Sequence, residues 1–172
     1  MSGNSNEQAE LGILARRRIE AGVIKPIYET MCRHLGKEKA QQIIGEAIAA
    51  TATQVGREFA AREPGGADIR TFVALQRLWT QDDALQVEVL RADDAGFSYD
   101  VHRCRYAEMY REMGLGEIGH LLSCNRDDAF IQGYDPRVKL TRTTTLMQGA
   151  KRCDFRYERV EPAAVLNVPK QD

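Results

Sequence analysis

Residues able to carry out chemistry are concentrated in one stretch of the chain. Three of the four cysteines and two of the three histidines lie from residue 102 to residue 154. A thiol near a helix N-terminus or a protonated histidine can ionise near neutral pH and act as a nucleophile. The candidates are Cys104, Cys124 and Cys153. Cys153 is the leading nucleophile, because it follows a glycine-containing turn and opens an expected strand, and Cys124 is the second. The alternative is that each is a packed core thiol, since free cysteine is among the most buried residue types.

Polar residues in the same stretch could assist such a nucleophile. His120 is the expected proton carrier, although a histidine satisfied by one backbone hydrogen bond would fit the sequence equally well. Asp127, Asp154 and Glu108 could orient a histidine or accept hydrogen bonds from an amino or amidine group. Arg142 could hold a carboxylate through two hydrogen bonds. Ordinary solvated charge is the alternative for these residues, and a helix N-terminal role is the alternative for Asp127.

A zinc site is a further alternative, because thiolates and imidazoles suit that ion. The available ligands would be His102, Cys104, His120, Cys124 and Cys153. No two cysteines are two to four residues apart, as they usually are in closed structural sites. We therefore predict no metal and no other cofactor, with zinc kept as the alternative.

The elements that must position these residues change type near the middle of the chain. Apolar residues follow helical spacing in the first half, where Gly36 and Glu63-Pro64-Gly65-Gly66 mark the breaks and Asp68 is an expected N-cap. Pro26 either kinks the first helix or divides it. The expected helices cover residues 10–35, 37–62 and 68–79.

Alternating apolar and polar residues in the second half predict two hairpins. The first joins strands at 85–89 and 97–101 through Asp93-Asp94-Ala95-Gly96, and the second joins strands at 140–147 and 154–160 through a turn at 148–151. Helices are expected between the hairpins at 104–113 and 117–123, the latter continued by 127–131.

The expected fold class is therefore α+β, with N-terminal helices packed on a mainly antiparallel sheet and further helices inserted between two hairpins. The 172 residues should form a single domain, with flexible tails at 1–9 and 162–172. With 24 basic and 25 acidic residues, the net charge of -1 predicts neither a nucleic-acid partner nor an anionic membrane partner. The N-terminus resembles no targeting signal and no apolar run spans a membrane, so a cytoplasmic location is expected. A homo-oligomer remains an open alternative.

Several short motifs follow one another along the chain. They are Ala15-Arg-Arg-Arg-Ile-Glu-Ala, Leu35-Gly36, Cys104-Arg-Tyr-Ala-Glu108, Leu115-Gly-Glu-Ile-Gly119, Leu122-Ser-Cys124-Asn-Arg-Asp127, Leu140-Thr-Arg142-Thr143 and Gly149-Ala-Lys-Arg-Cys153-Asp154-Phe155. In this order they resemble the L-2-amino-thiazoline-4-carboxylic acid hydrolase family, and the resemblance covers most of residues 10–160.

The resemblance implies hydrolytic opening of a small cyclic amidine or isothiourea carboxylate to a carbamoyl amino acid. In that reaction a cysteine would attack the ring carbon, His120 would carry protons, and Asp127 and Asp154 would orient the histidine or hold the amidinium. Arg142 would bind the substrate carboxylate, with Cys104, Glu108 and His102 completing the binding site. The alternative function on the same fold is a module that binds a small ligand, or senses a metal or thiol, without turnover.

Overall fold

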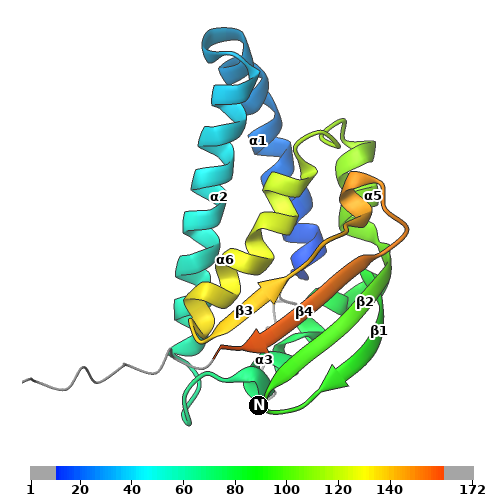
Figure 1. The fold of residues 1–172 in the computed structure, drawn as a ribbon. Helices are drawn as coiled ribbons and strands as arrows, with labels where there is room; N and C mark the ends of the chain where they lie inside the picture. The colour runs from blue at the N-terminus through cyan, green and yellow to red at the C-terminus, as the bar shows by residue number, and fades with distance from the viewer. Residues whose placement is uncertain (1–10, 161–172) are drawn as a thin grey trace, which may run out of the picture.

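The computed structural model describes residues 11–160 (Figure 1). Two long antiparallel helices begin the described chain, α1 (Ile13–Leu35) and α2 (Lys37–Ala60). Gly36 separates them with a φ of 80°, a conformation that favours glycine. Pro26 lies inside α1, which continues through it as one helix. The alternative of two shorter helices is therefore wrong.

Two short helices lead from α2 to the sheet, α3 (Ile69–Leu75) and α4 (Arg77–Thr80). Asp68 caps α3 as its sequence position predicts, because its carboxylate accepts a hydrogen bond from the backbone N–H of Thr71 at 2.8 Å. The hydroxyl of Thr71 accepts one from the Asp68 backbone in return, so the start of α3 is secured from both sides.

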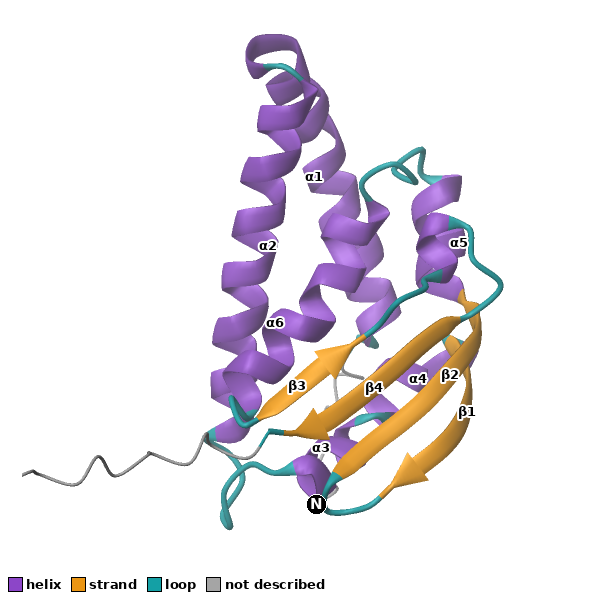
Figure 2. Ribbon diagram, viewed as in Figure 1, coloured by secondary structure: helices purple, strands orange, loops and turns teal. Residues whose placement is uncertain are grey.

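The sheet has four strands in the order β1-β2-β4-β3, with every neighbouring pair antiparallel (Figure 2). The strands are β1 (Leu85–Ala92), β2 (Gly96–Cys104), β3 (Val138–Thr141) and β4 (Cys153–Arg159). The predicted first hairpin is β1 and β2, and its turn is held by Asp93, whose carboxylate accepts hydrogen bonds from two backbone N–H groups at 2.9 Å.

Two β-bulges interrupt the pairing of β1 with β2. Val87 is opposite Val101, whereas the preceding Gln86 is opposite Arg103, so β2 carries one extra residue there. Further along, Val89 and Arg91 pair with consecutive residues of β2, so Leu90 is the extra residue on β1. Each bulge reverses the alternation of side chains between the two faces beyond it.

The helices between the hairpins are α5 (Arg105–Glu112) and α6 (Asn125–Tyr134). A π-helical segment at His120–Cys124 runs directly into α6, so the predicted helices at 117–123 and 127–131 form one continuous helical stretch. α6 packs tightly along α2: a Cβ added at Gly133 would lie 2.1 Å from the Thr53 carbonyl oxygen. Glycine at this position therefore allows the two helices to approach closely.

The second hairpin differs from its prediction at residues 142–152, which we call the strap loop. The strand predicted at 140–147 ends at Thr141 because the backbone N–H groups of Thr143 and Thr144 donate to Asp154, at 2.9 and 2.6 Å, instead of to a strand. A short 3-10 helix follows at Leu146–Gln148. Threonine favours strands, but here the hydrogen bonds to the Asp154 carboxylate hold the backbone in a loop.

All the described helices lie on one face of the sheet, which leaves the other face uncovered within residues 11–160 (Figure 1). This arrangement confirms the α+β prediction. No helix in the described residues is both long enough and apolar enough to cross a membrane. The predicted tails at 1–9 and 162–172 lie outside the described residues.

Candidate ligand-binding and active site

A cavity of about 280 Å³ lies where α1, α2, α6, the sheet and the strap loop meet. Eight aromatic side chains contribute to its lining, including Trp79, which is the only tryptophan in the chain. Arg16 of α1 and Thr51 of α2 are exposed members of the lining. A volume near the lower end of the range for ligand pockets suits a small molecule with an apolar ring.

The structure brings five of the predicted site residues together at this cavity: Cys104, Cys124, Cys153, Asp127 and Arg142. Cys124 ends the π-helical segment and Cys153 opens β4. Cys104 reaches the cavity because the extra residue on β2 reverses the alternation after Val101, which also lines it.

The three cavity thiols are neutral near pH 7. Burial raises the pKa of Cys104 to about 11 and that of Cys124 to about 12, and Asp127 adds to the rise at Cys124. Burial also raises the pKa of Cys153, although a hydrogen bond from the backbone N–H of Leu146 to its sulfur, at 3.2 Å, opposes the rise. Deprotonation would place an anion among apolar side chains, so these thiols lack the activation that a cysteine nucleophile needs.

Asp127 and Arg142 form an ion pair in the cavity wall. Nη1 of Arg142 lies 2.5 Å from Oδ2 of Asp127, and its Nη2 donates to the Cys124 carbonyl oxygen at 3.0 Å. The Arg142 guanidinium also stacks over the Phe155 ring, 4.8 Å from its centre.

Burial and charge act oppositely on this pair. Burial raises the pKa of Asp127, and Arg142 opposes that rise. Burial alone would lower the pKa of Arg142, but the Asp127 carboxylate raises it above its ordinary value. The Asp127 side chain is still 29% exposed. Because Asp127 lines the cavity, a ligand there can reach its carboxylate.

A second charged group at the cavity was not predicted. Nη1 of Arg17 lies 2.7 Å from Oε1 of Glu20, and Nη2 of Arg126 lies 2.9 Å from Oε2 of the same carboxylate. All three residues line the cavity. The sequence contains a usable signal, because residues three apart on a helix face the same side and Arg17 and Glu20 belong to the Arg-rich motif of α1.

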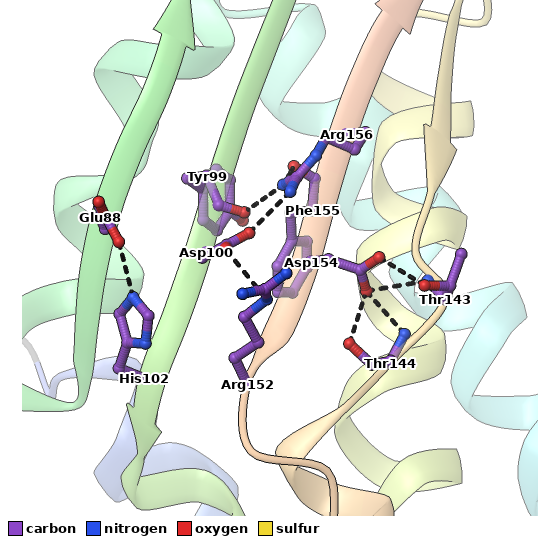
Figure 3. A network of polar contacts seen from close by, with 10 residues as sticks. All are labelled: Glu88, Tyr99, Asp100, His102, Thr143, Thr144, Arg152, Asp154, Phe155 and Arg156. Atoms are coloured by element: carbon purple, nitrogen blue, oxygen red, sulfur yellow. Dashed lines mark hydrogen bonds and ion pairs between the residues drawn. The ribbon is translucent and has the colours of Figure 1, made fainter.

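Three of the predicted residues lie away from the cavity, on or beside the uncovered side of the sheet. His102 pairs with Glu88 at 2.9 Å, as Figure 3 shows, and Glu108 pairs with the exposed Arg103 at 2.9 Å. Asp154 follows Cys153 on β4 and therefore points to the opposite face, where it holds the strap loop (Figure 3). Its neighbour there is Asp100, which is buried between Arg152 and Arg156.

His120 also does not line the cavity, although it begins the π-helical segment that ends at Cys124. Within residues 11–160 no histidine lines the cavity. The described residues also contain no group of three or more His, Cys, Asp or Glu placed to hold a metal ion.

The fold is a small α+β domain with a cavity of about 280 Å³ between its helices and its sheet. The chain belongs to the L-2-amino-thiazoline-4-carboxylic acid hydrolase family, whose pattern matches residues 16–157. No curated protein matches the sequence. Among solved structures, the chain is similar to the phenol-responsive sensory domain of the transcription activator PoxR with phenol. The TM-score is 0.52 and the identity 10%, over 80% of this chain and 73% of that one. At that identity the likeness concerns the fold alone.

Proposed function

We propose that the protein hydrolyses a small cyclic amidine or isothiourea that carries a carboxylate, and that the reaction takes place in the cavity. The observation that carries the proposal is the carboxylate of Asp127, which faces a cavity of small-molecule size and is held in place by Arg142. Membership of a hydrolase family supports the reaction type. The aromatic wall provides a surface for a flat ring.

The chemistry proposed for Asp127 is general-base catalysis. Asp127 removes a proton from a water molecule, whose oxygen bonds to the ring carbon between sulfur and nitrogen. The carbon–sulfur bond then breaks, and the sulfur takes up the proton from Asp127. The carbonyl forms as the remaining hydroxyl proton passes to the ring nitrogen. The product is a carbamoyl amino acid with a free thiol, so one water is consumed and no oxidant or reductant is needed.

This mechanism replaces attack by a cysteine, because the cavity thiols are neutral and no histidine of the described residues lines the cavity. The proposed mechanism therefore gives the base role to Asp127 and uses no step on Cys153, Cys124 or His120. Arg142 positions Asp127 in this proposal, because it donates to that carboxylate and to the Cys124 carbonyl oxygen and its charge is balanced by Asp127.

The test is turnover of 2-amino-thiazoline-4-carboxylate, followed by mass spectrometry of the ring-opened product. Asp127→Asn should lower kcat by about 100-fold or more, the usual effect of losing a general base. The matched control is Asp128→Asn, an exposed neighbour that does not line the cavity, and it should leave the rate unchanged. Cys153→Ser should keep most of the activity. An Asp127→Asn variant that is folded and fully active would refute the role of Asp127.

A second candidate function is ligand binding without turnover. Two observations favour it: the neutral thiols, and the fold shared with a sensory domain whose structure holds phenol. The same assay separates the two functions. A ligand that binds in the cavity and is recovered unchanged after prolonged incubation supports the sensory function and contradicts the hydrolase.

A further inference from the structure

We infer that Arg17 and Arg126, which share the single carboxylate of Glu20, form the subsite that binds the carboxylate group of the ligand. The inference deepens the proposed function, on which it rests only in taking the cavity as the ligand site. It replaces Arg142 as the carboxylate anchor and restricts the ligands to small organic acids.

The two arginines share one carboxylate partner. Nη1 of Arg17 lies 2.7 and 2.8 Å from the two oxygens of Glu20, and Nη2 of Arg126 lies 2.9 Å from one of them. Nε of Arg126 donates to the Leu122 carbonyl oxygen at 2.7 Å. Each guanidinium has five N–H donors. Within residues 11–160, these bonds leave N–H groups on both arginines for a ligand in the cavity.

The charges along the cavity wall also support a carboxylate subsite at Arg17 and Arg126. Arg142 and Asp127 neutralise each other, whereas Arg17 and Arg126 carry two positive charges against the one negative charge of Glu20. The Arg126 side chain is only 13% exposed, so solvent screens this excess poorly. A bound carboxylate would balance the charge and accept two guanidinium hydrogen bonds.

The helix that carries Arg126 also orients the ligand. Arg126 and Asp127 are consecutive residues of α6, and both line the cavity. The Leu122 carbonyl that holds Arg126 belongs to the π-helical segment, so the guanidinium is held in place before a ligand arrives. An acid bound at Arg126 would therefore place its ring near Asp127 and against the aromatic wall.

The probe for this subsite is 2-aminothiazole-4-carboxylate, whose aromatic ring resists hydrolytic opening, compared with its neutral carboxamide. Trp79 lines the cavity and is the only tryptophan, so its fluorescence reports binding directly. We expect the parent protein to bind the carboxylate at least tenfold more tightly than the carboxamide. Equal affinity for the two, or no binding of the carboxylate at millimolar concentration, would overturn the inference.

Variants of α1 assign the effect to residues. Arg17→Gln should weaken carboxylate binding by about tenfold or more and leave carboxamide binding nearly unchanged. The matched control is Arg18→Gln, because Arg18 is 56% exposed, pairs with Glu112 and does not line the cavity. Glu20→Gln should tighten carboxylate binding several-fold, since it removes the competing anion. A purely structural role for Glu20 predicts the opposite sign, so weaker binding in this variant contradicts the inference.

The outcomes also separate this inference from the proposed function. Carboxylate binding that depends on Arg17, in a protein that never opens the aminothiazoline ring, removes the hydrolase and keeps the subsite. Turnover that is unaffected by Arg17→Gln removes the subsite and keeps the hydrolase. Thermal melting of each variant shows whether it folds. If Arg17→Gln does not fold, the relative affinity of the parent protein for the carboxylate and the carboxamide still tests whether the cavity has a carboxylate subsite.

Discussion

The neutral state of the cavity thiols has a measurable consequence for alkylation. A free cysteine with a pKa of about 8.5 is about 3% thiolate at pH 7. With a pKa of about 11, Cys104 is about 0.01% thiolate at that pH, and with about 12, Cys124 is about 0.001%. Iodoacetamide reacts with the thiolate, so ionisation alone should slow alkylation about 300-fold at Cys104 and about 3000-fold at Cys124.

The assay is timed alkylation of the folded protein, followed by peptide mass spectrometry, with the urea-unfolded protein as the reference for each cysteine. Between pH 7 and pH 10 the rate at Cys104 should rise about tenfold per pH unit, because its thiol is still far from half ionised. In the unfolded protein the rate should level off above pH 9. A merely shielded thiol of ordinary pKa would also level off there.

The result that refutes this reasoning is alkylation of folded Cys104 or Cys124 at pH 7 within about tenfold of the unfolded rate. Circular dichroism must show that the protein remains folded during the reaction. Such a result would mean that something in the folded protein stabilises the thiolate, and cysteine attack would again be the leading mechanism for the proposed hydrolysis.

Two further predictions concern stability. Gly133→Ala should destabilise the fold by about 1–3 kcal/mol, since the new Cβ would lie 2.1 Å from a carbonyl oxygen of α2. Its melting temperature should therefore fall by roughly 2–12 °C. The control is Gly22→Ala, whose Cβ would have nothing within 4 Å and which should melt no lower than the parent. Asp154→Asn should loosen the strap loop, detected as faster hydrogen exchange at the N–H groups of Thr143 and Thr144. Although burial opposes the shift, hydrogen bonds from these threonines lower the pKa of Asp154. The Asp154 carboxylate therefore stabilises the fold fully above about pH 4, and this stabilisation is lost as the pH falls through the lowered pKa of the folded state. Melting temperatures of the parent and of Asp154→Asn that fall equally with acid would contradict this.

Most of the fold could be predicted because local patterns and tertiary packing agree in it. The helical spacing of apolar residues in α1 and α2, the N-cap Asp68 and the alternation in β1 and β2 each describe what the structure contains. The strap loop could not be predicted in this way. Its threonines favour a strand locally, and the acceptor that draws them away lies on β4, about ten residues further along the chain.

The candidate site was only partly predictable. The face of the sheet to which a side chain points depends on strand pairing as well as on the position of the residue in the strand. Simple alternation already separates Cys153 from Asp154, and applying it would have removed Asp154 from the site. Alternation alone fails at His102 and Cys104. It places both side chains on the same face of β2, whereas Cys104 lines the cavity and His102 pairs with Glu88 away from it. The bulge that separates them depends on the register with β1, which no local pattern reveals.

The second bulge, at Leu90, affects whether the edge of the sheet can pair with a strand of another molecule. β1 is an edge strand, and Val89 and Leu90 leave 57% and 52% of their surface exposed on it. A flat edge carrying two such side chains would be a template for strand addition and aggregation. The bulge twists the edge and breaks its regular row of hydrogen-bonding groups. The bulge therefore disfavours self-association by extension of this sheet through β1.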